Sequence, residues 1–328
     1  MRIVVSALGF SLVAKAVDVA GLVDRARDGE PRAVARLISL VEQGSSALPE
    51  VAAALAPHTG HARVVGITGA PGVGKSTSTN ALVRAFRDQG KRVAVVAVDP
   101  SSPFSGGALL GDRVRMGDHA TDSGVFIRSM ATRGHLGGLS WATPQALRVL
   151  DAAGFDVILV ETVGVGQSEV EIVALADTTL VLLAPGMGDG IQAAKAGILE
   201  IADVFVVNKA DRDGADQTAR DLKYMISLGR RDREGPLWRP PVVKTVAARM
   251  EGLDRVVEAI AEHQEWMASH GELEERRLRR AAAEIEAIAV ERVRTRFGAV
   301  DQLAKRVVSG ELDPFAAAEQ LISGNLRE

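Results

Sequence analysis

Residues 69–76 constrain the fold of this chain more than any other part of its sequence. They read GAPGVGKS, which matches the spacing G-x-x-x-x-G-K-[ST]. A loop of this kind turns its backbone N–H groups toward phosphate groups. The β-branched segment RVVGIT precedes it, and the helical pattern STSTNALVRAFRDQG follows it. The chain is therefore predicted to pass from a strand into a helix around a nucleotide phosphate.

Two side chains of this loop are predicted to act on the phosphates directly. Lys75 would neutralise the β and γ phosphates as a catalytic residue, and the Ser76 hydroxyl would bind Mg²⁺. The positive end of the following helix adds to the attraction for phosphate. The predicted phosphate contacts are Gly69, Ala70, Pro71, Gly72, Val73, Gly74, Lys75, Ser76 and Thr77.

Short apolar runs alternate with helical segments from about residue 63 to residue 252. The runs are RVVGIT, RVAVVAVD, VFIRSM, DVILVE, TTLVLLA, DVFVVN and PVVK. Near-continuous apolar runs indicate strands that are covered on both faces, and their alternation with helices indicates a mostly parallel sheet. We therefore predict a doubly wound α/β domain.

Helical patterns flank this core on both sides. Residues 17–56 carry apolar side chains at spacings of three and four, and residues 271–298 give one long helical pattern. Asp313 and Pro314 indicate the start of a shorter helix. We divide the chain into an N-terminal helical extension (residues 1–62), a nucleotide-binding domain (63–262) and a C-terminal helical region (263–328). The long helix has an apolar stripe of Leu278, Ala282, Ile285, Ala289 and Val293. This stripe could pack on the core, or the helix could be an oligomerisation arm.

A polar set at the end of the run DVFVVN predicts which base is bound. Asn208, Lys209 and Asp211 form the pattern N-K-x-D. The Asp211 carboxylate can accept from the ring N–H and the exocyclic amino group of guanine, whereas adenine would leave it unpaired. The predicted ligand is therefore GTP or GDP. In the loop TVAARM, where a serine is usual, a backbone N–H would reach the guanine carbonyl; the candidates are Val246, Ala247 and Ala248.

Acidic residues near two other strand ends predict how the γ-phosphate is sensed. Asp99 directly follows VAVVAV, Asp112 lies in the segment after it, and Glu161 ends the run DVILVE. Carboxylates there can hold Mg²⁺ or orient a water, and we assign Asp99 a catalytic role. Gly164 would offer its N–H to the γ-phosphate, and Val165 in place of a glutamine predicts slow intrinsic hydrolysis. The predicted Mg²⁺ ligands are Ser76, Asp99, Asp112 and Glu161.

Composition narrows the partners and the compartment. The formal net charge of −3 gives no broad electrostatic reason to expect nucleic acid or an anionic membrane as a partner. The chain has no cysteine, which excludes disulfides, thiolate metal sites and cysteine nucleophiles. Together with nucleotide chemistry, this predicts a cytoplasmic location.

Six segments together resemble the MeaB/ArgK family of P-loop GTPases, the bacterial relatives of the human methylmalonic aciduria type A protein. They are GITGAPGVGKST, VDPSSPFSGGALLGDRVRM, IRSMATRGHLGGL, ETVGVGQSE, GMGDGIQAAKAG and NKAD. The resemblance implies a GTPase chaperone for adenosylcobalamin-dependent methylmalonyl-CoA mutase, which gates cofactor loading and protects or reactivates the mutase. It also implies a homodimer joined through C-terminal helices, with no cobalamin bound by the chain itself.

The same resemblance changes the interpretation of the segment GMGDGIQAAKAG. Judged by its residues alone, this segment is an ordinary turn between a strand and a helix. The family has a third switch there, which couples to the partner and assists hydrolysis. This implies switch roles for Asp189, Gln192 and Lys195, and a catalytic role for Lys195.

Two other functions compete with the mutase chaperone. An older view of the same family is a nucleotide-dependent kinase linked to lysine, arginine and ornithine transport, but the guanine-binding pattern argues against ATP. A GTPase that inserts nickel into an enzyme would share the fold. Metal delivery favours Cys or clustered His, whereas this chain has no Cys and its six His are mostly scattered.

Overall fold

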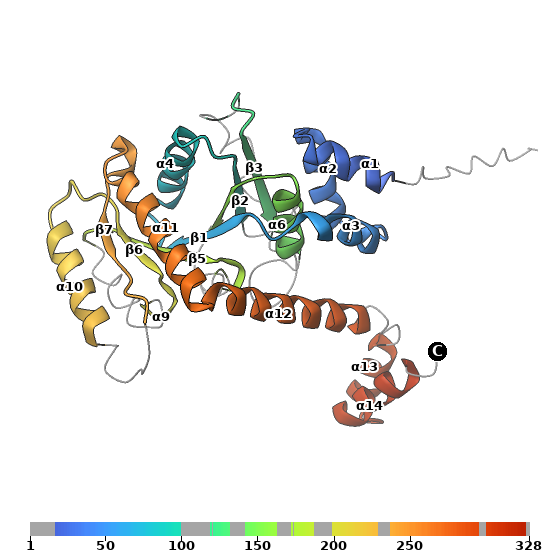
Figure 1. The fold of residues 1–328 in the computed structure, drawn as a ribbon. Helices are drawn as coiled ribbons and strands as arrows, with labels where there is room; N and C mark the ends of the chain where they lie inside the picture. The colour runs from blue at the N-terminus through green and yellow to red at the C-terminus, as the bar shows by residue number, and fades with distance from the viewer. Residues whose placement is uncertain are drawn as a thin grey trace, which may run out of the picture.

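The computed structural model describes residues 17–99, 119, 121–131, 142–162, 172, 174–186, 199–228, 237–294 and 300–325. Within these residues seven strands form one sheet in the order β3-β2-β4-β1-β5-β6-β7 (Figure 1), and every neighbouring pair is parallel. The predicted doubly wound α/β fold is confirmed. The strands are β1 (Arg63–Gly69), β2 (Val93–Asp99), β3 (Val125–Ala131), β4 (Val157–Thr162), β5 (Thr178–Leu183), β6 (Val204–Val207) and β7 (Val242–Lys244).

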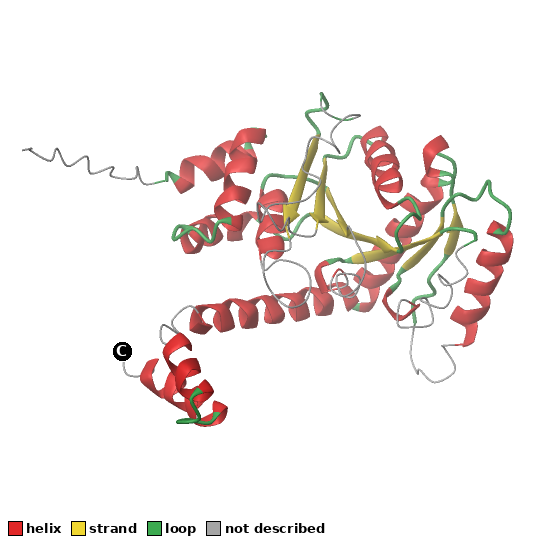
Figure 2. Cartoon of the chain, turned by 180° about the vertical axis from the view of Figure 1, so that it is seen from behind, coloured by secondary structure: helices red, strands yellow, loops and turns green. Residues whose placement is uncertain are grey.

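Helices cover both faces of the sheet because successive strand residues point to opposite sides. Val65 and Leu159 face a layer built by α4 (Lys75–Asp88) and α11 (Leu253–His270). Val64 and Ile158 face the opposite layer, which contains α6 (Ala142–Ala152), and α10 (Ala215–Leu228) covers the same side at the β6–β7 end. Figure 2 shows the two layers from behind. The buried strands account for the continuous apolar runs in the sequence.

The N-terminal extension forms three short helices that join the core through α6. They are α1 (Val19–Arg27), α2 (Pro31–Glu42) and α3 (Leu48–Leu55), followed by the single turn η1 (Ala56–His58). Leu37 and Ile38 of α2 are fully buried in the same apolar cluster as Leu150 of α6. Glu42 also pairs with Arg128 of β3 at 2.6 Å. This extension is therefore fixed to one flank of the sheet.

The C-terminal helices begin inside the core and then leave it (Figure 1). Buried Val256, Ile260 and Met267 show that α11 belongs to the α/β domain along its length. The predicted boundary between residues 262 and 263 falls inside this continuous helix, and we propose Gly271 as the division instead. Beyond it lie α12 (Glu272–Arg294), α13 (Val300–Val308) and α14 (Pro314–Asn325), which begins as predicted with Asp313 Oδ1 accepting from two backbone N–H groups.

Arginines of α12 fix that helix to the amino ends of two central strands. Arg276 makes two hydrogen bonds, of 2.8 and 2.9 Å, to the carboxylate of Asp203, the residue before β6. Arg280 donates to Asp177, the residue before β5, at 3.2 Å, and Arg277 lies 3.4 Å from the same carboxylate. Both carboxylates are almost fully buried. None of the helices in the described ranges is both long and apolar enough to cross a membrane.

Candidate nucleotide site

The predicted phosphate loop connects β1 to α4, as its sequence pattern requires. Gly69 has φ +141°, and a Cβ there would lie 2.3 Å from the carbonyl oxygen of Leu182 in β5. Gly74 has φ +95° and directly precedes α4. Both positions therefore require glycine on steric grounds. The sheet order places this loop at the carboxyl end of β1, between β4 and β5, where doubly wound folds bind ligands.

Lys75 bonds to two carbonyl groups of its own loop. Its Nζ donates to the carbonyl oxygen of Gly69 at 2.5 Å and to that of Ala70 at 3.3 Å. The side chain is nearly buried, so its ammonium group is kept close to the loop. A nucleotide phosphate would offer this cation a charged acceptor in place of neutral carbonyls, and charge-assisted hydrogen bonds are the stronger kind.

Asn208 links the phosphate loop to the loop after β7. Its Nδ2 donates to the carbonyl oxygen of Val73 at 2.9 Å. Its Oδ1 accepts from Thr245 Oγ1 at 3.2 Å and from the N–H of Ala247 at 3.1 Å. A Cβ at Gly74 would lie 2.5 Å from the same Nδ2, so the amide approaches the loop closely. The buried amide therefore bonds to both loops at once.

The other two residues of the N-K-x-D set lie beside Asn208 with different partners. Lys209, whose φ is +57°, extends its Nζ to the carbonyl oxygen of Gly72 at 2.6 Å. Asp211 is about 41% exposed, and Arg249 lies 3.7 Å from its carboxylate. The exposed part of this carboxylate can be reached by a ligand. The geometry thus brings the predicted base-binding and phosphate-binding residues together.

The three predicted backbone donors of the loop after β7 are not equivalent. The N–H of Val246 donates to the carbonyl oxygen of Glu251 at 3.0 Å, and that of Ala247 donates to Asn208. The N–H of Ala248 has no acceptor within the described chain, and this residue is exposed. We therefore propose that Ala248 faces the guanine carbonyl. The turn η3 (Ala247–Arg249) holds this N–H in place.

Two of the predicted Mg²⁺ ligands are in contact. Ser76 Oγ donates to Glu161 Oε1 at 2.6 Å. Glu161 is 2% exposed and lies in β4 opposite Ile67 of β1, so the sheet fixes its distance from the loop. Mg²⁺ prefers hard oxygen ligands and usually takes only one or two from the protein. A hydroxyl and a carboxylate at the phosphate loop fit that preference.

Other predicted site residues lie wholly or partly outside the described residues. The backbone of Asp99 ends β2, one position after the pair formed by Val98 and Thr162, but its side chain is outside the description. The remaining ones are Asp112, Gly164, Asp189, Gln192 and Lys195. Their roles remain predictions from sequence and resemblance.

Two residues of the site were missed in the sequence. Thr245 supplies the hydroxyl that bonds Asn208, although the missing serine suggested that no side chain would help there. Arg249 pairs with Asp211, although the two are far apart in the chain. Thr245 could have been found from its place at the start of the loop TVAARM, whereas nothing in the local pattern marks Arg249.

Comparisons with known proteins show which family the chain resembles. The family model described as "Methylmalonyl Co-A mutase-associated GTPase MeaB" matches residues 34–302. A protein of Pyrococcus abyssi, provisionally named a GTPase, is 48% identical over 307 residues, which cover 92% of this chain and 95% of that protein. The mitochondrial methylmalonic aciduria type A homolog of Mus musculus is 36% identical over 266 residues, covering 79% of this chain and 64% of the relative.

A solved structure resembles the chain along nearly its whole length. The crystal structure of LAO/AO transport system kinase superposes with a TM-score of 0.69 at 29% identity, covering 93% of this chain and 96% of that one. Because the match covers 93% of the chain, it extends beyond the nucleotide-binding domain of residues 63–262.

Proposed function

This chain belongs to the MeaB family of methylmalonyl-CoA mutase-associated GTPases, and on that premise we propose that it is a GTP-hydrolysing chaperone of an adenosylcobalamin-dependent methylmalonyl-CoA mutase. GTP hydrolysis is the activity of the family and of this chain. The finer role is the gating of cofactor loading, together with protection or reactivation of the mutase. The observation that carries it is the family match over residues 34–302.

The residues described above suggest how the nucleotide is held. GTP would displace the Lys75 ammonium from the carbonyl of Gly69, and the lysine would neutralise charge on the β and γ phosphates. Ser76 and Glu161 would hold Mg²⁺, which supplies further neutralisation of phosphate charge when bound. Asp211 would accept from guanine, with Ala248 opposite the carbonyl. Gly164 and Asp99 are proposed to sense the γ-phosphate.

Coupling to the mutase is proposed to use the segment after β5. Asp189, Gln192 and Lys195 follow β5 in the sequence, and β5 pairs with β1, the strand that leads into the phosphate loop. We propose that Lys195 assists hydrolysis when the mutase is bound. Binding of the mutase would then shorten the lifetime of the GTP-bound state. Without the mutase this lifetime would be long, because Val165 stands where a glutamine would favour hydrolysis.

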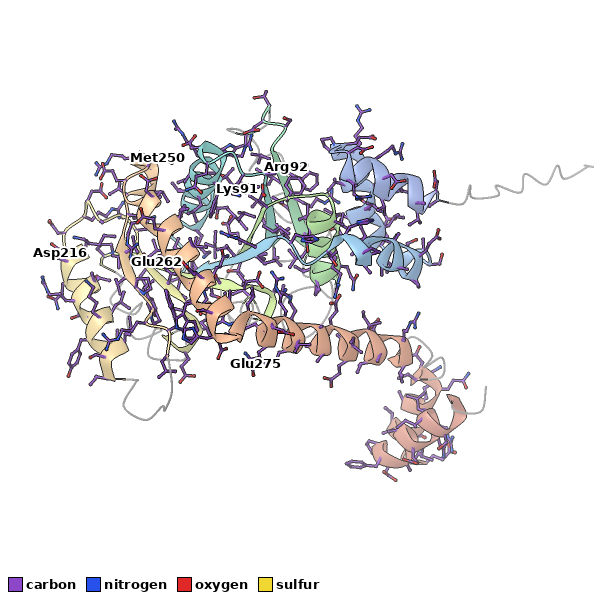
Figure 3. All side chains as sticks on the ribbon, viewed as in Figure 1. Lys91, Arg92, Asp216, Met250, Glu262 and Glu275 are labelled. Carbon is purple, nitrogen blue, oxygen red and sulfur yellow. The ribbon has the colours of Figure 1, made fainter. Side chains whose placement is uncertain are left out.

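A homodimer is part of the proposal, and α12 supports it. Leu278, Ile285 and Val293 of the predicted apolar stripe are 63%, 69% and 53% exposed. The first half of α12 contacts the core as far as Glu284, which bonds Arg148 of α6, whereas α13 and α14 lie away from the α/β domain (Figure 3). An exposed apolar stripe of this length on one helix is typical of an interaction surface. A second copy of the chain would cover it.

The proposal is tested by measuring GTP turnover with and without purified methylmalonyl-CoA mutase. We expect slow phosphate release alone, a clear acceleration with mutase, and loss of that acceleration in Lys195→Ala. Lys75→Ala serves as the inactive control. If the GTP turnover rate were the same at every mutase concentration, the chaperone role would be contradicted, whereas the GTPase activity would stand.

The same assay separates the kinase alternative, which the solved relative's name favours. A kinase transfers the γ-phosphoryl group to a protein, whereas a GTPase releases it to water. With γ-labelled GTP we expect the label as inorganic phosphate; label retained on a binding protein would support the kinase. A cytoplasmic location and the lack of bound cobalamin remain predictions.

A further inference from the structure

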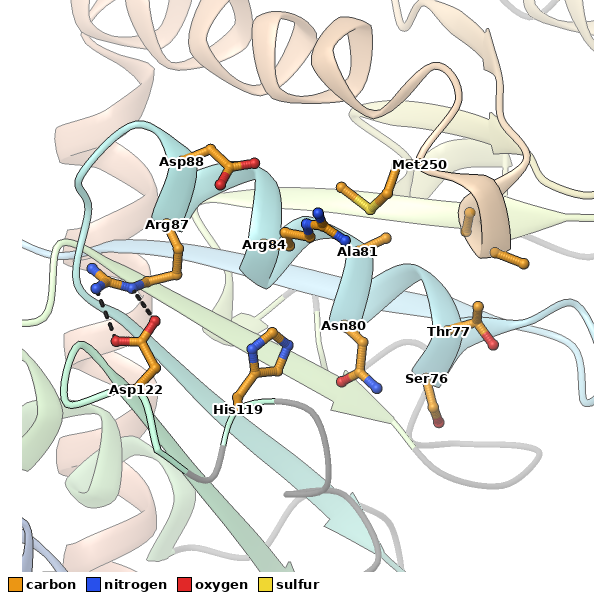
Figure 4. Close-up of a pocket in the computed structure, with 12 residues that line it drawn as sticks. Ser76, Thr77, Asn80, Ala81, Arg84, Arg87, Asp88, His119, Asp122 and Met250 are labelled. Carbon is orange, nitrogen blue, oxygen red and sulfur yellow. Dashed lines mark hydrogen bonds and ion pairs between the residues drawn. The ribbon is translucent and has the colours of Figure 1, made fainter.

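A cavity of about 220 Å³ lies at the amino ends of β1 and β4 and is bounded by α6 and α12. Val64 of β1, which lines it, is five residues before Gly69. At about 3.3 Å per residue, this places the cavity roughly 16 Å from the phosphate loop. It is therefore separate from the cavity along α4 (Figure 4), which begins at Ser76 and belongs to the nucleotide site.

The lining of this cavity combines apolar side chains with arginines from two helices. The apolar part comes from both strands and from α6, and it consists of Val64, Leu147 and Ile158. The arginines are Arg148 of α6 and Arg277 and Arg280 of α12. A ligand in the cavity would therefore meet an apolar surface and several cations at once.

The two carboxylates in the lining are already engaged by donors from the protein. Asp151 accepts hydrogen bonds from the three successive backbone N–H groups of residues 60–62. Glu284 of α12 accepts from Arg148 and Gln145, both of α6. A cation entering the cavity would have to displace these donors. The carboxylates therefore do not make it a metal site.

The arginines of α12, by contrast, have donors that are not used. Arg277 donates through its two Nη groups to the carbonyl oxygens of Gly60 and Ala62, but its buried Nε has no acceptor among the described residues. Arg280 donates through Nη1 alone, although a guanidinium carries five N–H donors. Buried donors normally have an acceptor. The unused hydrogen-bonding capacity of the cavity is thus that of donors.

Donors on cationic side chains favour an oxyanion as the ligand. Carboxylate and phosphate groups accept pairs of guanidinium N–H bonds, and such charge-assisted bonds are the strong ones. The lining has three arginines against two carboxylates, so one negative charge would balance it. Asp177, which pairs with Arg277 and Arg280, lies outside the lining, is buried, and already accepts the N–H of Val64.

The size of the cavity limits the oxyanion to a small one. Its volume is below the ~300–1,000 Å³ that is usual for sites of drug-sized ligands. A phosphate ion or a short-chain carboxylate fits this volume, whereas a nucleotide does not. The apolar lining suits a carboxylate that carries a short alkyl chain.

We propose that this cavity binds a small oxyanion, which bridges Arg277 and Arg280 of α12 to Arg148 of α6. Such a ligand would hold α12 more firmly on the α/β domain. Because α12 is also the helix proposed to carry the dimer contact, the oxyanion would act as an effector of that helix. Inorganic phosphate and a short-chain carboxylate share the required chemistry, and binding measurements distinguish them.

The test is titration calorimetry of the full chain with sodium phosphate and, separately, with sodium butyrate, each compared with sodium chloride at equal ionic strength. GDP and Mg²⁺ are kept in excess, so that the phosphate loop is occupied. We expect a Kd of about 1 mM or lower for at least one of the two ions, which a ligand of about five heavy atoms can reach. Tighter binding of phosphate would identify an inorganic ligand, and tighter binding of butyrate an organic acid.

Four variants locate the site. Ala281→Phe fills the cavity and leaves its three arginines in place, so the Kd should rise at least tenfold, whereas Ala283→Phe, at an exposed position of the same helix, should leave the Kd unchanged. Arg280→Gln should raise the Kd roughly tenfold or more, because a charged hydrogen bond is lost. If Arg280→Gln fails to fold, the two phenylalanine variants still decide the question. Lys75→Ala should bind the ion as wild type does, which separates this site from the phosphate loop.

A second measurement tests the effect on α12. Hydrogen exchange of the amides of α12 should become severalfold slower when the ion is added to wild-type protein, and it should not change in Ala281→Phe. The absence of measurable heat with both ions would mean that the cavity holds only water. Equal Kd values in wild type and Ala281→Phe would place the ion elsewhere on the surface. Either result would overturn the proposal, and unchanged exchange of α12 would overturn the role as an effector.

Discussion

Asn208 is the residue on which the geometry of the site depends most directly. Its buried amide bonds to the phosphate loop through Val73 and to the loop after β7 through Thr245 and Ala247. These three segments are far apart in the sequence, and a buried amide with three hydrogen bonds fixes their relative positions. Base binding and phosphate binding thus share one side chain.

Replacing Asn208 by alanine should affect both stability and binding. The change leaves a buried carbonyl and a buried N–H without partners, which costs about 1–3 kcal/mol for each such group. We expect the free energy of unfolding in urea to fall by about 2–4 kcal/mol and GDP affinity to fall as well. Asn80→Ala is the matched control for stability, since Asn80 has no partner within the described chain. Equal unfolding midpoints for the two variants would contradict the role given to Asn208.

The sequence predicted the short motifs of this site well and the contacts between them less well. The phosphate loop and the N-K-x-D set depend on spacings of a few residues, and these spacings are visible in the chain. Thr245 and Arg249 act on residues 37 and 38 positions earlier, so their roles follow only from the packing of β6 beside β7. Local patterns carry no information of that kind.

At the scale of elements, α12 depends on the carboxylates before β5 and β6. Helical spacing alone would pair Glu272 with Arg276, four residues later, but the structure pairs Arg276 with Asp203 instead. A nearly buried carboxylate attracts an arginine more strongly than an exposed glutamate does, because water screens it less. Helical spacing predicted the helix correctly and the partner wrongly for this reason.

Removal of this arginine should weaken the fold, whereas removal of a neighbour on the same helix should not. Arg276→Ala takes two hydrogen bonds from a charged, buried acceptor, and we expect a loss of about 2–3 kcal/mol in unfolding free energy. Arg279 pairs with Glu272 and Glu275 only at 4.0 and 3.9 Å, with all three side chains exposed by more than a third. Arg279→Ala should therefore change stability by less than about 0.5 kcal/mol. If urea unfolding showed similar losses of unfolding free energy in both variants, the Arg276–Asp203 contact would not be a specific anchor of α12.

Asp203 should also give the fold a dependence on pH. Burial alone would raise its pKa, but hydrogen bonds from His263 and Arg276 outweigh burial and lower the pKa below its usual value. A folded pKa below the unfolded one, about 3.9, means that the ionised carboxylate stabilises the protein above that pH. This stabilisation is lost as the pH falls through the folded pKa.

The corresponding measurement is urea unfolding between pH 7 and pH 3. We expect the stability difference between wild type and Asp203→Asn to be largest at neutral pH and to shrink below about pH 4. Asp24→Asn, at an exposed position on α1, controls for the general effect of acid. A difference that stays constant down to pH 3 would show that the Asp203 charge does not stabilise the fold.

At the scale of the whole molecule, the seven strands of a mostly parallel sheet and the helical flanks followed from sequence, but the order of the strands in the sheet and the position of α11 did not. The division made from the sequence ends the nucleotide-binding domain at residue 262, inside the segment LDRVVEAIAEHQEWMASH. His263 and Gln264 are nevertheless buried, and His263 bonds Thr178 at 2.9 Å. A polar side chain can be buried when it has a hydrogen-bond partner, and the sequence does not show which residue that partner is.

The proposed dimer gives the prediction that belongs to this scale. Ile285→Glu places a charge in the middle of the apolar stripe of α12, and we expect it to convert a dimer into a monomer, as measured by light scattering. Glu286→Gln, at the exposed neighbouring position, should leave the dimer intact. Substitution is preferable to shortening the chain after residue 252, because that would remove the buried side of α11. An unchanged mass for Ile285→Glu would place the interface elsewhere.

The anchoring of α12 has a mechanical consequence for the molecule. Arg276 holds the residue before β6, and Asn208 follows the same strand at its other end. At about 3.3 Å per residue, the five steps between Asp203 and Asn208 span roughly 16 Å. A short strand that is hydrogen-bonded on both sides is stiff. Through β6, α12 is therefore coupled to Asn208, so a tilt of α12 on dimer formation would shift the guanine end of the site before the phosphate end.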